Sequence, residues 1–233
     1  MGYDIGKNIV IDTPWNNINL RESYIRFGGP EEQKMEEKKV IYKVNEMFES
    51  IQGEGYHTGE PVIFVRLAGC SMGCEWCDTK YCQEVHYKLT AEQIVEHIEK
   101  NFVKKPIVIS GGEPFEQDLR QLVNLLKQKC YHIWVETNGA EPIPDFISVW
   151  LTVSPKKHFL SENLNKADEI KLVISNEQDI KRAKIMRSHY GKTNFYLQPE
   201  SGKKSATQLC VKTCIEDPRF KLSAQVHKLI DIK

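Results

Sequence analysis

The chain has 233 residues, 40% of them hydrophobic and 27% charged, which is the composition of an ordinary folded domain with a full apolar core. Its 32 basic and 32 acidic residues cancel, which disfavours direct nucleic-acid binding and favours small-molecule chemistry. The N-terminus lacks the apolar run of a signal peptide, and no stretch is apolar for the roughly 18 residues of a membrane span, so we expect a cytoplasmic protein without a membrane partner.

Short apolar runs begin only at Val40, after a polar and aperiodic stretch, so the sequence predicts an N-terminal extension of unknown role at 1–38 and a folded domain at 39–233. Runs rich in valine and isoleucine then predict strands at 40–48, 62–69, 106–110, 131–137, 149–154, 169–175, 194–198 and 222–227. Amphipathic segments predict helices at 90–102, 115–129, 176–190 and 205–217. This alternation predicts an α/β fold with a parallel sheet and helical crossovers, either an open sheet or a partial barrel, with its chemistry at the C-terminal ends of the strands.

Three cysteines, Cys70, Cys74 and Cys77, lie in the stretch CSMGCEWC directly after the predicted strand 62–69. Because the chain has seven cysteines and no export signal, this cluster favours metal binding or catalysis over a disulfide framework. A structural zinc site needs four closed ligands, and the more distant Cys82 is the candidate for the fourth. Three thiolates suit a 4Fe-4S cluster whose fourth iron is left open to a ligand. The sequence therefore favours the iron-sulfur cluster and keeps zinc as the alternative.

The spacing of these cysteines, with an aromatic residue just before the last, resembles the radical S-adenosylmethionine (SAM) superfamily. The segment SGGEP at 110–114 on its own indicates no more than a strand-to-helix turn. It lies one strand and one helix after the cysteines, however, where this superfamily binds the methionyl amino group of SAM. The resemblance implies a partial, TIM-like barrel and a SAM pocket lined from successive strand ends by Gly111, Gly112, Glu113, Thr137, Asn138, Ser154, Lys156 and Gln198.

Further motifs resemble the 7-carboxy-7-deazaguanine synthases over residues 41–233, namely NEMFESIQGEG, CDT, GGEP, ETNG, VSPK, ADEIK, LQP and QVHKLI. The resemblance implies a radical SAM lyase of queuosine or related deazapurine biosynthesis, with 39–233 as its catalytic domain. Such a lyase contracts the ring of 6-carboxy-5,6,7,8-tetrahydropterin, releases ammonia and forms 7-carboxy-7-deazaguanine. The resemblance also implies a homodimer and a flavodoxin- or ferredoxin-like reductant.

The same resemblance implies a set of substrate contacts, whose chemistry suits a molecule with a carboxylate and a guanine-like face. Arg66 offers a cation to the carboxylate, and Gln52 and Glu54 flank a glycine in QGEG. His227 in QVHK is expected to be another contact, although a histidine on a strand is more often structural. The terminal carboxylate is expected to reach the substrate from Lys233, which stands where some family members end in proline.

Thr79 follows the last cysteine in CDT, and the resemblance implies that its hydroxyl binds a magnesium ion shared with the substrate. Mg2+ prefers oxygen ligands and keeps several waters, so one weak protein ligand is chemically reasonable. Asp78, next to it, is expected to cap the loop by accepting hydrogen bonds from backbone amides.

Two other functions stay open from the sequence. One is a different radical SAM enzyme, such as a glycyl-radical activase, against which QGEG, CDT and QVHK speak; the other is a non-catalytic zinc-binding module. The four remaining cysteines are not assigned to the site. Cys82 and Cys130 are expected to be spectators, and Cys210 and Cys214, four residues apart on a predicted helix, are expected to be packing thiols.

Overall fold

The computed structural model describes residues 38–75, 77–145 and 147–233, and the residues from Lys39 onward form one compact unit. The predicted extension at 1–38 lies outside the described residues except for Lys38, so it stays a prediction. In the described part of the chain, no helix is long and apolar enough to cross a bilayer.

One sheet of nine strands forms the centre of this unit, in the order β3-β1-β2-β4-β5-β6-β7-β8-β9. Its strands are β1 (Tyr42–Ile51), β2 (Pro61–Leu67), β3 (Tyr87–Leu89), β4 (Ile107–Gly111), β5 (Ile133–Thr137), β6 (Trp150–Val153), β7 (Glu169–Ile174), β8 (Asn194–Pro199) and β9 (Phe220–Leu222). The helices are α1 (Ala91–Asn101), α2 (Arg120–Gln128), α3 (Ser161–Lys166), α4 (Glu177–His189), α5 (Lys204–Glu216) and α6 (Val226–Leu229), with 3-10 turns at η1 (Lys80–Gln83) and η2 (Pro114–Glu116).

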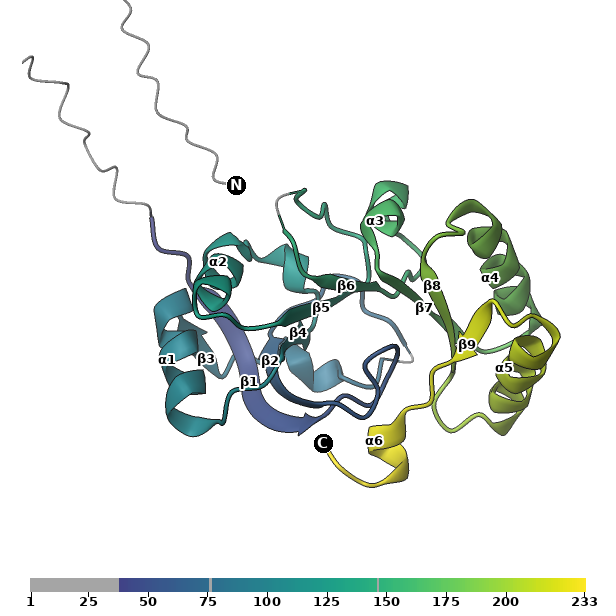
Figure 1. The fold of residues 1–233 in the computed structure, drawn as a ribbon, viewed down its shortest axis with the longest axis horizontal. Coiled ribbons are helices and arrows are strands. Elements are labelled where there is room, and N and C mark those ends of the chain that lie inside the picture. Colours follow the sequence, from purple (N-terminus) through teal and green to yellow (C-terminus); the bar gives the residue numbers. More distant parts are fainter. Residues whose placement is uncertain (1–37, 76, 146) are drawn as a thin grey trace, which may run out of the picture. The chain divides into compact units, whose positions relative to one another are not determined.

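The run of strands from β2 through β4 to β9 is parallel throughout, whereas β1 pairs antiparallel with β2 and β3 antiparallel with β1. Figure 1 shows the sheet curving, with helices α1 to α5 on its outer side. Because β3 and β9 are edges that do not pair with each other, the barrel is open. The predicted parallel sheet with helical crossovers, in the form of a partial barrel, is thus confirmed.

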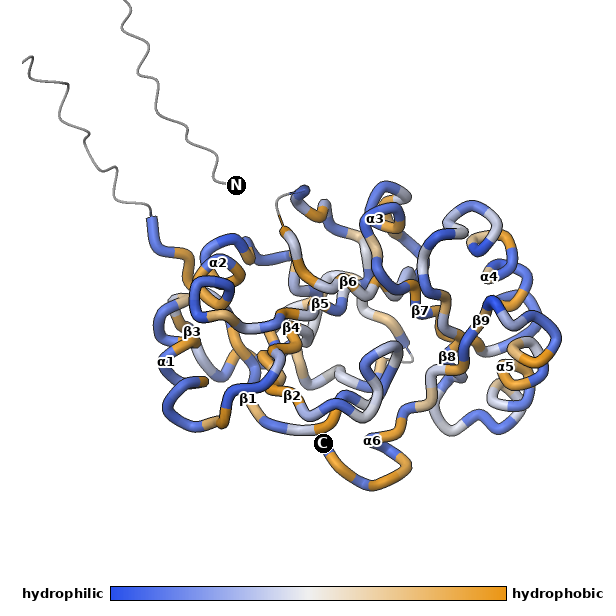
Figure 2. The backbone as a smooth tube through the Cα atoms, viewed as in Figure 1, coloured by the Kyte–Doolittle hydropathy of each residue, from blue (hydrophilic) through white to orange (hydrophobic). Residues whose placement is uncertain are grey.

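Apolar side chains between the sheet and its helices explain why these segments fold. Val65, Ile109 and Val135 on neighbouring strands are completely buried. Helix α1 is capped by Thr90, whose side chain forms the predicted capping box with Gln93, and it buries the predicted apolar stripe. Figure 2 shows apolar residues alternating with hydrophilic ones along these outer helices. Each aliphatic side chain buried in this way stabilises the fold by roughly 1.5–3 kcal/mol.

The predicted strand at 222–227 is wrong. Strand β9 ends at Leu222, and the chain then turns into the short helix α6, so that His227 lies on a helix. The alternation in LSAQVH is typical of an edge strand, but the amide of Val226 donates to the carbonyl of Gly53 at 2.9 Å and draws the chain away from the sheet. Strand β3 and helix α3 were not predicted, because both are short and lack a continuous apolar pattern.

Candidate active site

A cavity of about 640 Å³ opens where the C-terminal ends of the parallel strands meet. It is lined by the predicted site residues except Glu113, that is, by Gln52, Glu54, Arg66, Cys70, Cys74, Cys77, Thr79, Gly111, Gly112, Thr137, Asn138, Ser154, Lys156, Gln198, His227 and Lys233. The fold therefore gathers into one place residues that are spread over most of the domain. Those that follow β2, β4, β5 and β6 lie at C-terminal strand ends, as expected for a parallel sheet. Gln52 and Glu54 come instead from the loop between β1 and β2, and His227 and Lys233 from the chain after β9.

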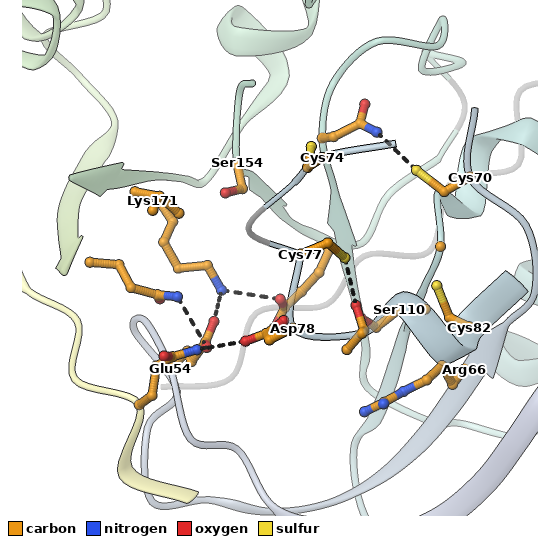
Figure 3. Close-up of a pocket in the computed structure, with 18 of the residues that line it drawn as sticks. Glu54, Arg66, Cys70, Cys74, Cys77, Asp78, Cys82, Ser110, Ser154 and Lys171 are labelled. Atoms are coloured by element: carbon orange, nitrogen blue, oxygen red, sulfur yellow. Dashed lines mark hydrogen bonds and ion pairs between the residues drawn. The ribbon is translucent and has the colours of Figure 1, made fainter. Parts of the chain in front are cut away.

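The cysteine loop, residues 70–79, leaves β2 and is fastened at its start, since the amide of Gly69 donates to the carbonyl of Cys82 at 2.9 Å. Figure 3 shows Cys70, Cys74 and Cys77 around the same side of the cavity. Cys82 also lines the cavity but is almost completely buried. Among the described residues, no three cysteine, histidine or acidic side chains stand close enough together to hold one metal ion.

Two glycines in SGGEP bring the end of β4 against this loop. The amide of Gly112 donates to the carbonyl of Leu67 at 3.0 Å, and the amide of Glu113 donates to that of Gly69 at 2.8 Å. A methyl group on Gly112 would overlap the carbonyl oxygen of Gly69 and lie 3.1 Å from the Cβ of Cys70. Gly112 thus keeps the cysteine loop and the predicted SAM-binding turn in backbone contact.

Glu113 does not line the cavity and is only 1% exposed. Its carboxylate accepts hydrogen bonds from the hydroxyl of Thr137 at 2.6 Å and from the amide of Asn138 at 2.7 Å. Burial raises the pKa of Glu113, although these hydrogen bonds partly oppose the rise. The structure therefore places the Glu113 side chain behind the wall, where it holds the end of β5, rather than in the cavity.

Lys156 and Ser154 follow β6 and lie together in the wall, with the ammonium donating to the Ser154 hydroxyl at 2.7 Å. Burial, together with the charge of Lys171, lowers the pKa of Lys156 to about 8. This ammonium is therefore partly buried among cavity residues and still positively charged at neutral pH.

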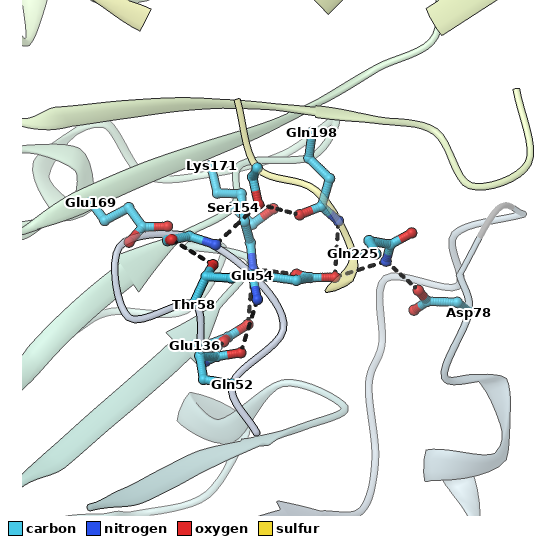
Figure 4. A network of polar contacts seen from close by, with 12 residues as sticks. Gln52, Glu54, Thr58, Asp78, Glu136, Ser154, Glu169, Lys171, Gln198 and Gln225 are labelled. Carbon is cyan, nitrogen blue, oxygen red and sulfur yellow. Dashed lines mark hydrogen bonds and ion pairs between the residues drawn. The ribbon is translucent and has the colours of Figure 1, made fainter. Parts of the chain in front are cut away.

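An ion-pair network around the buried Lys171, which we call the acidic cradle, consists of Glu54, Glu136 and Lys171 (Figure 4). The ammonium of Lys171 lies 2.5 Å from the carboxylate of Glu54 and 3.1 Å from that of Glu136. Burial lowers the pKa of Lys171, but Glu136, Glu54 and Glu169 outweigh burial and raise it overall. Burial likewise acts to raise the pKa of Glu54, but Lys171 brings it below its usual value. The ammonium of Lys171 and the carboxylate of Glu54 thus each favour the charged form of the other.

Amide side chains donate hydrogen bonds to the two carboxylates of the cradle. Gln52 donates to Glu136 at 2.8 Å, and Gln198 donates to Glu54 at 3.1 Å. The Ser223 hydroxyl donates to Gln198 at 3.1 Å and is less than 2% exposed. Gln198, expected in the SAM pocket, is thus placed by the structure against the predicted substrate residue Glu54.

The loop that carries Gln52 and Glu54, residues 52–60, joins β1 to β2 at the opposite end of the sheet from the cysteine loop. It is closed by hydrogen bonds between Gln52 and the residues at its far end, from the Gln52 amide to the Glu60 carbonyl and from the Gly59 amide to the Gln52 carbonyl, both 2.8 Å. A methyl group on Gly53 would overlap the ring of His227, which explains the glycine. The loop therefore forms the floor of the cavity and packs against α6.

Arg66 and Lys233 lie at the cavity edge and share one carboxylate. Arg66 lies 3.3 Å from Glu46, and the Lys233 ammonium also pairs with Glu46. The hydroxyl of Ser50 donates to the main-chain oxygen of Lys233, and the Lys233 ammonium lies 4.7 Å from the centre of the Phe48 ring. The structure thus brings together Arg66, predicted to bind the substrate carboxylate, and Lys233, predicted to contact the substrate from the C-terminal tail.

The side-chain contacts of Asp78 differ from the loop cap that the sequence predicts. Its carboxylate accepts from the Lys228 ammonium at 2.6 Å and from the Gln225 amide at 3.0 Å, which ties the cysteine loop to α6. Burial acts to raise the pKa of Asp78, but these contacts lower it overall. The neighbouring Thr79 hydroxyl lies in the cavity wall, 3.5 Å from the Cys77 sulfur.

Sequence reasoning missed the positions of Glu46, Glu136, Lys171 and Gln225 in this site. Lys171 and Glu136 carry a detectable signal, because each interrupts a run of valine and isoleucine in a strand, in EIKLVI and in IWVET. A charged residue in a strand of a parallel sheet that is covered on both faces needs a buried partner. Glu46 and Gln225 carry no comparable local signal.

Glu169, below the cradle, is a further buried carboxyl that only the structure reveals. It is 1% exposed and accepts a hydrogen bond from the amide of Tyr56 at 2.9 Å. Burial raises the pKa of Glu169 from 4.5 to about 7. Between these values the folded state binds more protons than the unfolded state, so its contribution to the free energy of unfolding falls as pH rises.

Replacement of Glu169 by glutamine should remove this pH dependence. The amide retains an acceptor for Tyr56 and carries no charge. At pH 5, Glu169→Gln should therefore have the same free energy of unfolding as the wild type. At pH 8, its free energy of unfolding should be higher than that of the wild type, by about 3 kcal/mol at most. Urea unfolding at a series of pH values measures the difference, with Glu177→Gln on the exposed start of α4 as the control. Parallel curves for wild type and Glu169→Gln would contradict the expectation.

Comparisons with a family model, with related sequences and with a solved structure agree with one another. Residues 64–188 match the Radical SAM superfamily. A 7-carboxy-7-deazaguanine synthase of Bacteroides thetaiotaomicron is 36% identical over 194 residues, which cover 83% of this chain and 100% of that protein. The synthase of Escherichia coli strain K12 is 35% identical over 224 residues, covering 82% of this chain and 99% of that protein. The crystal structure of QueE from Escherichia coli aligns with a TM-score of 0.73 at 34% identity, covering 80% of this chain and 95% of that one.

Proposed function

Since this chain belongs to the 7-carboxy-7-deazaguanine synthase family of radical SAM enzymes, we propose that it converts 6-carboxy-5,6,7,8-tetrahydropterin to 7-carboxy-7-deazaguanine. The ring contracts and ammonia leaves, in the pathway to queuosine or a related deazapurine. The observation that carries the proposal is a single cavity in which a three-thiol loop faces the acidic cradle. One side of this cavity suits a redox cofactor, and the other suits a polar heterocycle.

The donor groups of the cavity fit the cofactors of the family. Cys70, Cys74 and Cys77 are soft ligands on one loop and would hold three irons of a 4Fe-4S cluster, with SAM on the fourth. Gly111 and Gly112 would present backbone groups to SAM beside that loop. When bound, the cluster and SAM supply the radical chemistry that starts the reaction. The hydroxyl of Thr79 is a suitable oxygen ligand for Mg2+ in the same wall.

The acidic cradle is proposed to bind the guanine-like face of the pterin. An ionised carboxylate accepts several hydrogen bonds, so Glu54 has capacity for N–H donors of the substrate beyond those of Lys171 and the two glutamines. Arg66, at the other edge of the cavity, would pair with the substrate carboxylate. Binding from two sides fixes the ring relative to the cysteine loop, and such orientation accounts for much of the catalytic contribution of a protein.

The direct test is an assay of the anaerobically reconstituted enzyme with the carboxytetrahydropterin, SAM, Mg2+ and a low-potential reductant, with the product identified by mass spectrometry. We expect a deazaguanine carboxylate and a loss of turnover when SAM or the reductant is omitted. A protein that binds zinc and forms no product would support a non-catalytic module. An iron-loaded protein without turnover of the pterin would support another radical SAM reaction.

Substitution of Gly112 should separate the cysteine loop from the turn beside it. Gly112→Ala adds a methyl group that overlaps the Gly69 carbonyl, so the loop must move, and we expect the iron content after reconstitution and the activity to fall at least about tenfold. Gly191→Ala is the matched control, because its methyl group would meet only the flexible side chain of Arg187 at 3.3 Å and ordinary backbone contact. Wild-type iron content and turnover in Gly112→Ala would show that the close contact is unimportant.

A small-molecule substrate and an external electron donor follow from the radical SAM family. The homodimer, the flavodoxin- or ferredoxin-like identity of the donor and the cytoplasmic location stay predictions from the sequence. Gel filtration with light scattering tests the first of these.

A further inference from the structure

Gln225 is the residue from which α6 starts, at the point where the chain leaves β9 and crosses toward β1 (Figure 1). The next residue, Val226, donates to the carbonyl of Gly53, so this crossing is fastened to the floor of the cavity. Gln225 itself lines the cavity. Its side chain is therefore in a position to contact both the loop 52–60 and the cysteine loop.

The side-chain amide of Gln225 connects the acidic cradle to the cysteine loop. Its nitrogen donates to Glu54 at 2.7 Å and to Asp78 at 3.0 Å, as Figure 4 shows. Its oxygen accepts from the ammonium of Lys228 at 2.9 Å, and that ammonium also pairs with Asp78. Glu54 and Asp78 are thus joined through one amide group.

The chemistry of this contact favours glutamine over other residues of similar size. A primary amide nitrogen has two hydrogens, and here each carboxylate takes one of them. A glutamate would place a third carboxylate between Glu54 and Asp78, and a leucine would leave both without this donor. The contact therefore needs a neutral side chain that donates twice.

We infer that Gln225 is a positioning residue that fixes the cysteine loop relative to Glu54. The inference rests on the proposed function, because the distance between the two segments matters for catalysis only if a cofactor at the cysteines acts on a substrate held at the cradle. Asp78 directly follows Cys77, so a shift of Asp78 moves the end of the cysteine loop. A misplacement of about 1 Å between reacting groups can reduce a rate about 100-fold.

A double-mutant cycle tests the inference on the reconstituted enzyme with Gln225→Leu, Asp78→Ala and the two combined. Each single substitution should lower kcat about 10- to 100-fold and change KM little, because Lys171 still holds Glu54. Since both substitutions break the same link, the double variant should be no slower than the slower single variant. Gln178→Leu, an exposed glutamine on α4, is the control and should leave kcat and KM unchanged.

Thermal unfolding of the same proteins gives a readout that does not depend on turnover. The decreases in Tm for the two single variants should likewise be non-additive, even if the wild type does not turn over the pterin, so failure of the proposed function and failure of this inference are distinguishable. The inference would be overturned if, in the double variant, the fold-reductions in kcat of the two single variants multiplied and their decreases in Tm added. A rise in KM at unchanged kcat in Gln225→Leu would overturn it as well, because it would make Gln225 a substrate contact.

Discussion

Replacing Lys171 by methionine should destabilise the protein by about 3–5 kcal/mol and abolish turnover, the cost expected when one partner of a buried ion pair is removed. The Lys171 side chain is only 4% exposed and supplies the cation for both Glu54 and Glu136. Methionine fills a similar volume, so the loss reflects two uncompensated, partly buried carboxylates rather than a void. Urea unfolding and the pterin assay measure the two effects.

Neutralising the carboxylates separates this explanation from a packing defect. The triple variant Lys171→Met, Glu54→Gln and Glu136→Gln has no buried charge in the cradle, so most of the lost stability should return while turnover stays absent. Lys184→Met, on an exposed part of α4, should change neither property. If the triple variant were as unstable as Lys171→Met alone, the charge explanation would be wrong.

Replacing Cys74 by alanine should reduce turnover to background while leaving the fold intact. Cys74 is half-buried in a loop outside the apolar core, so loss of its thiol removes a proposed cluster ligand without opening a void among packed side chains. Iron content, visible absorption and turnover after anaerobic reconstitution report the loss of the cluster. Circular dichroism reports the fold.

Cys82 is the matched control for this experiment, since it is the cysteine that a four-thiolate site would require. Its thiol is 2% exposed, and burial raises its pKa, which disfavours the thiolate. Cys82→Ala should therefore keep the wild-type iron content and most of the turnover. Loss of bound metal in both variants would favour a site with four sulfur ligands and would remove the open iron on which the proposed reaction depends.

The parallel sheet could be predicted from the sequence because its signals are local. The runs that became β2, β4 and β7 are short and rich in β-branched residues, and α1 has both its capping box and its apolar stripe within one segment. The order of strands along the chain then placed the cysteine loop and SGGEP at one edge of the sheet. The residues expected to line that edge do so, except for Glu113.

The acidic cradle could not be predicted, because its members are distant in sequence. Lys171 is 117 residues from Glu54 and 35 from Glu136, and no local pattern indicates which of the charged residues meet. The helix at His227 was missed for a related reason: a hydrogen bond to Gly53, far away in the chain, overrides the alternating pattern. Such interactions depend on tertiary geometry, which periodicity and residue composition do not encode.

The connection between β1 and β2 has a consequence for how this enzyme family can diversify. It supplies the cavity floor from the opposite end of the sheet, whereas the thiols come from the loop after β2. The proposed contacts to the heterocycle therefore come partly from a segment of chain separate from the one that carries the thiols. Substitutions within the nine residues 52–60 can accordingly alter the proposed substrate contacts of Gln52 and Glu54 without changing the sequence of the cysteine loop.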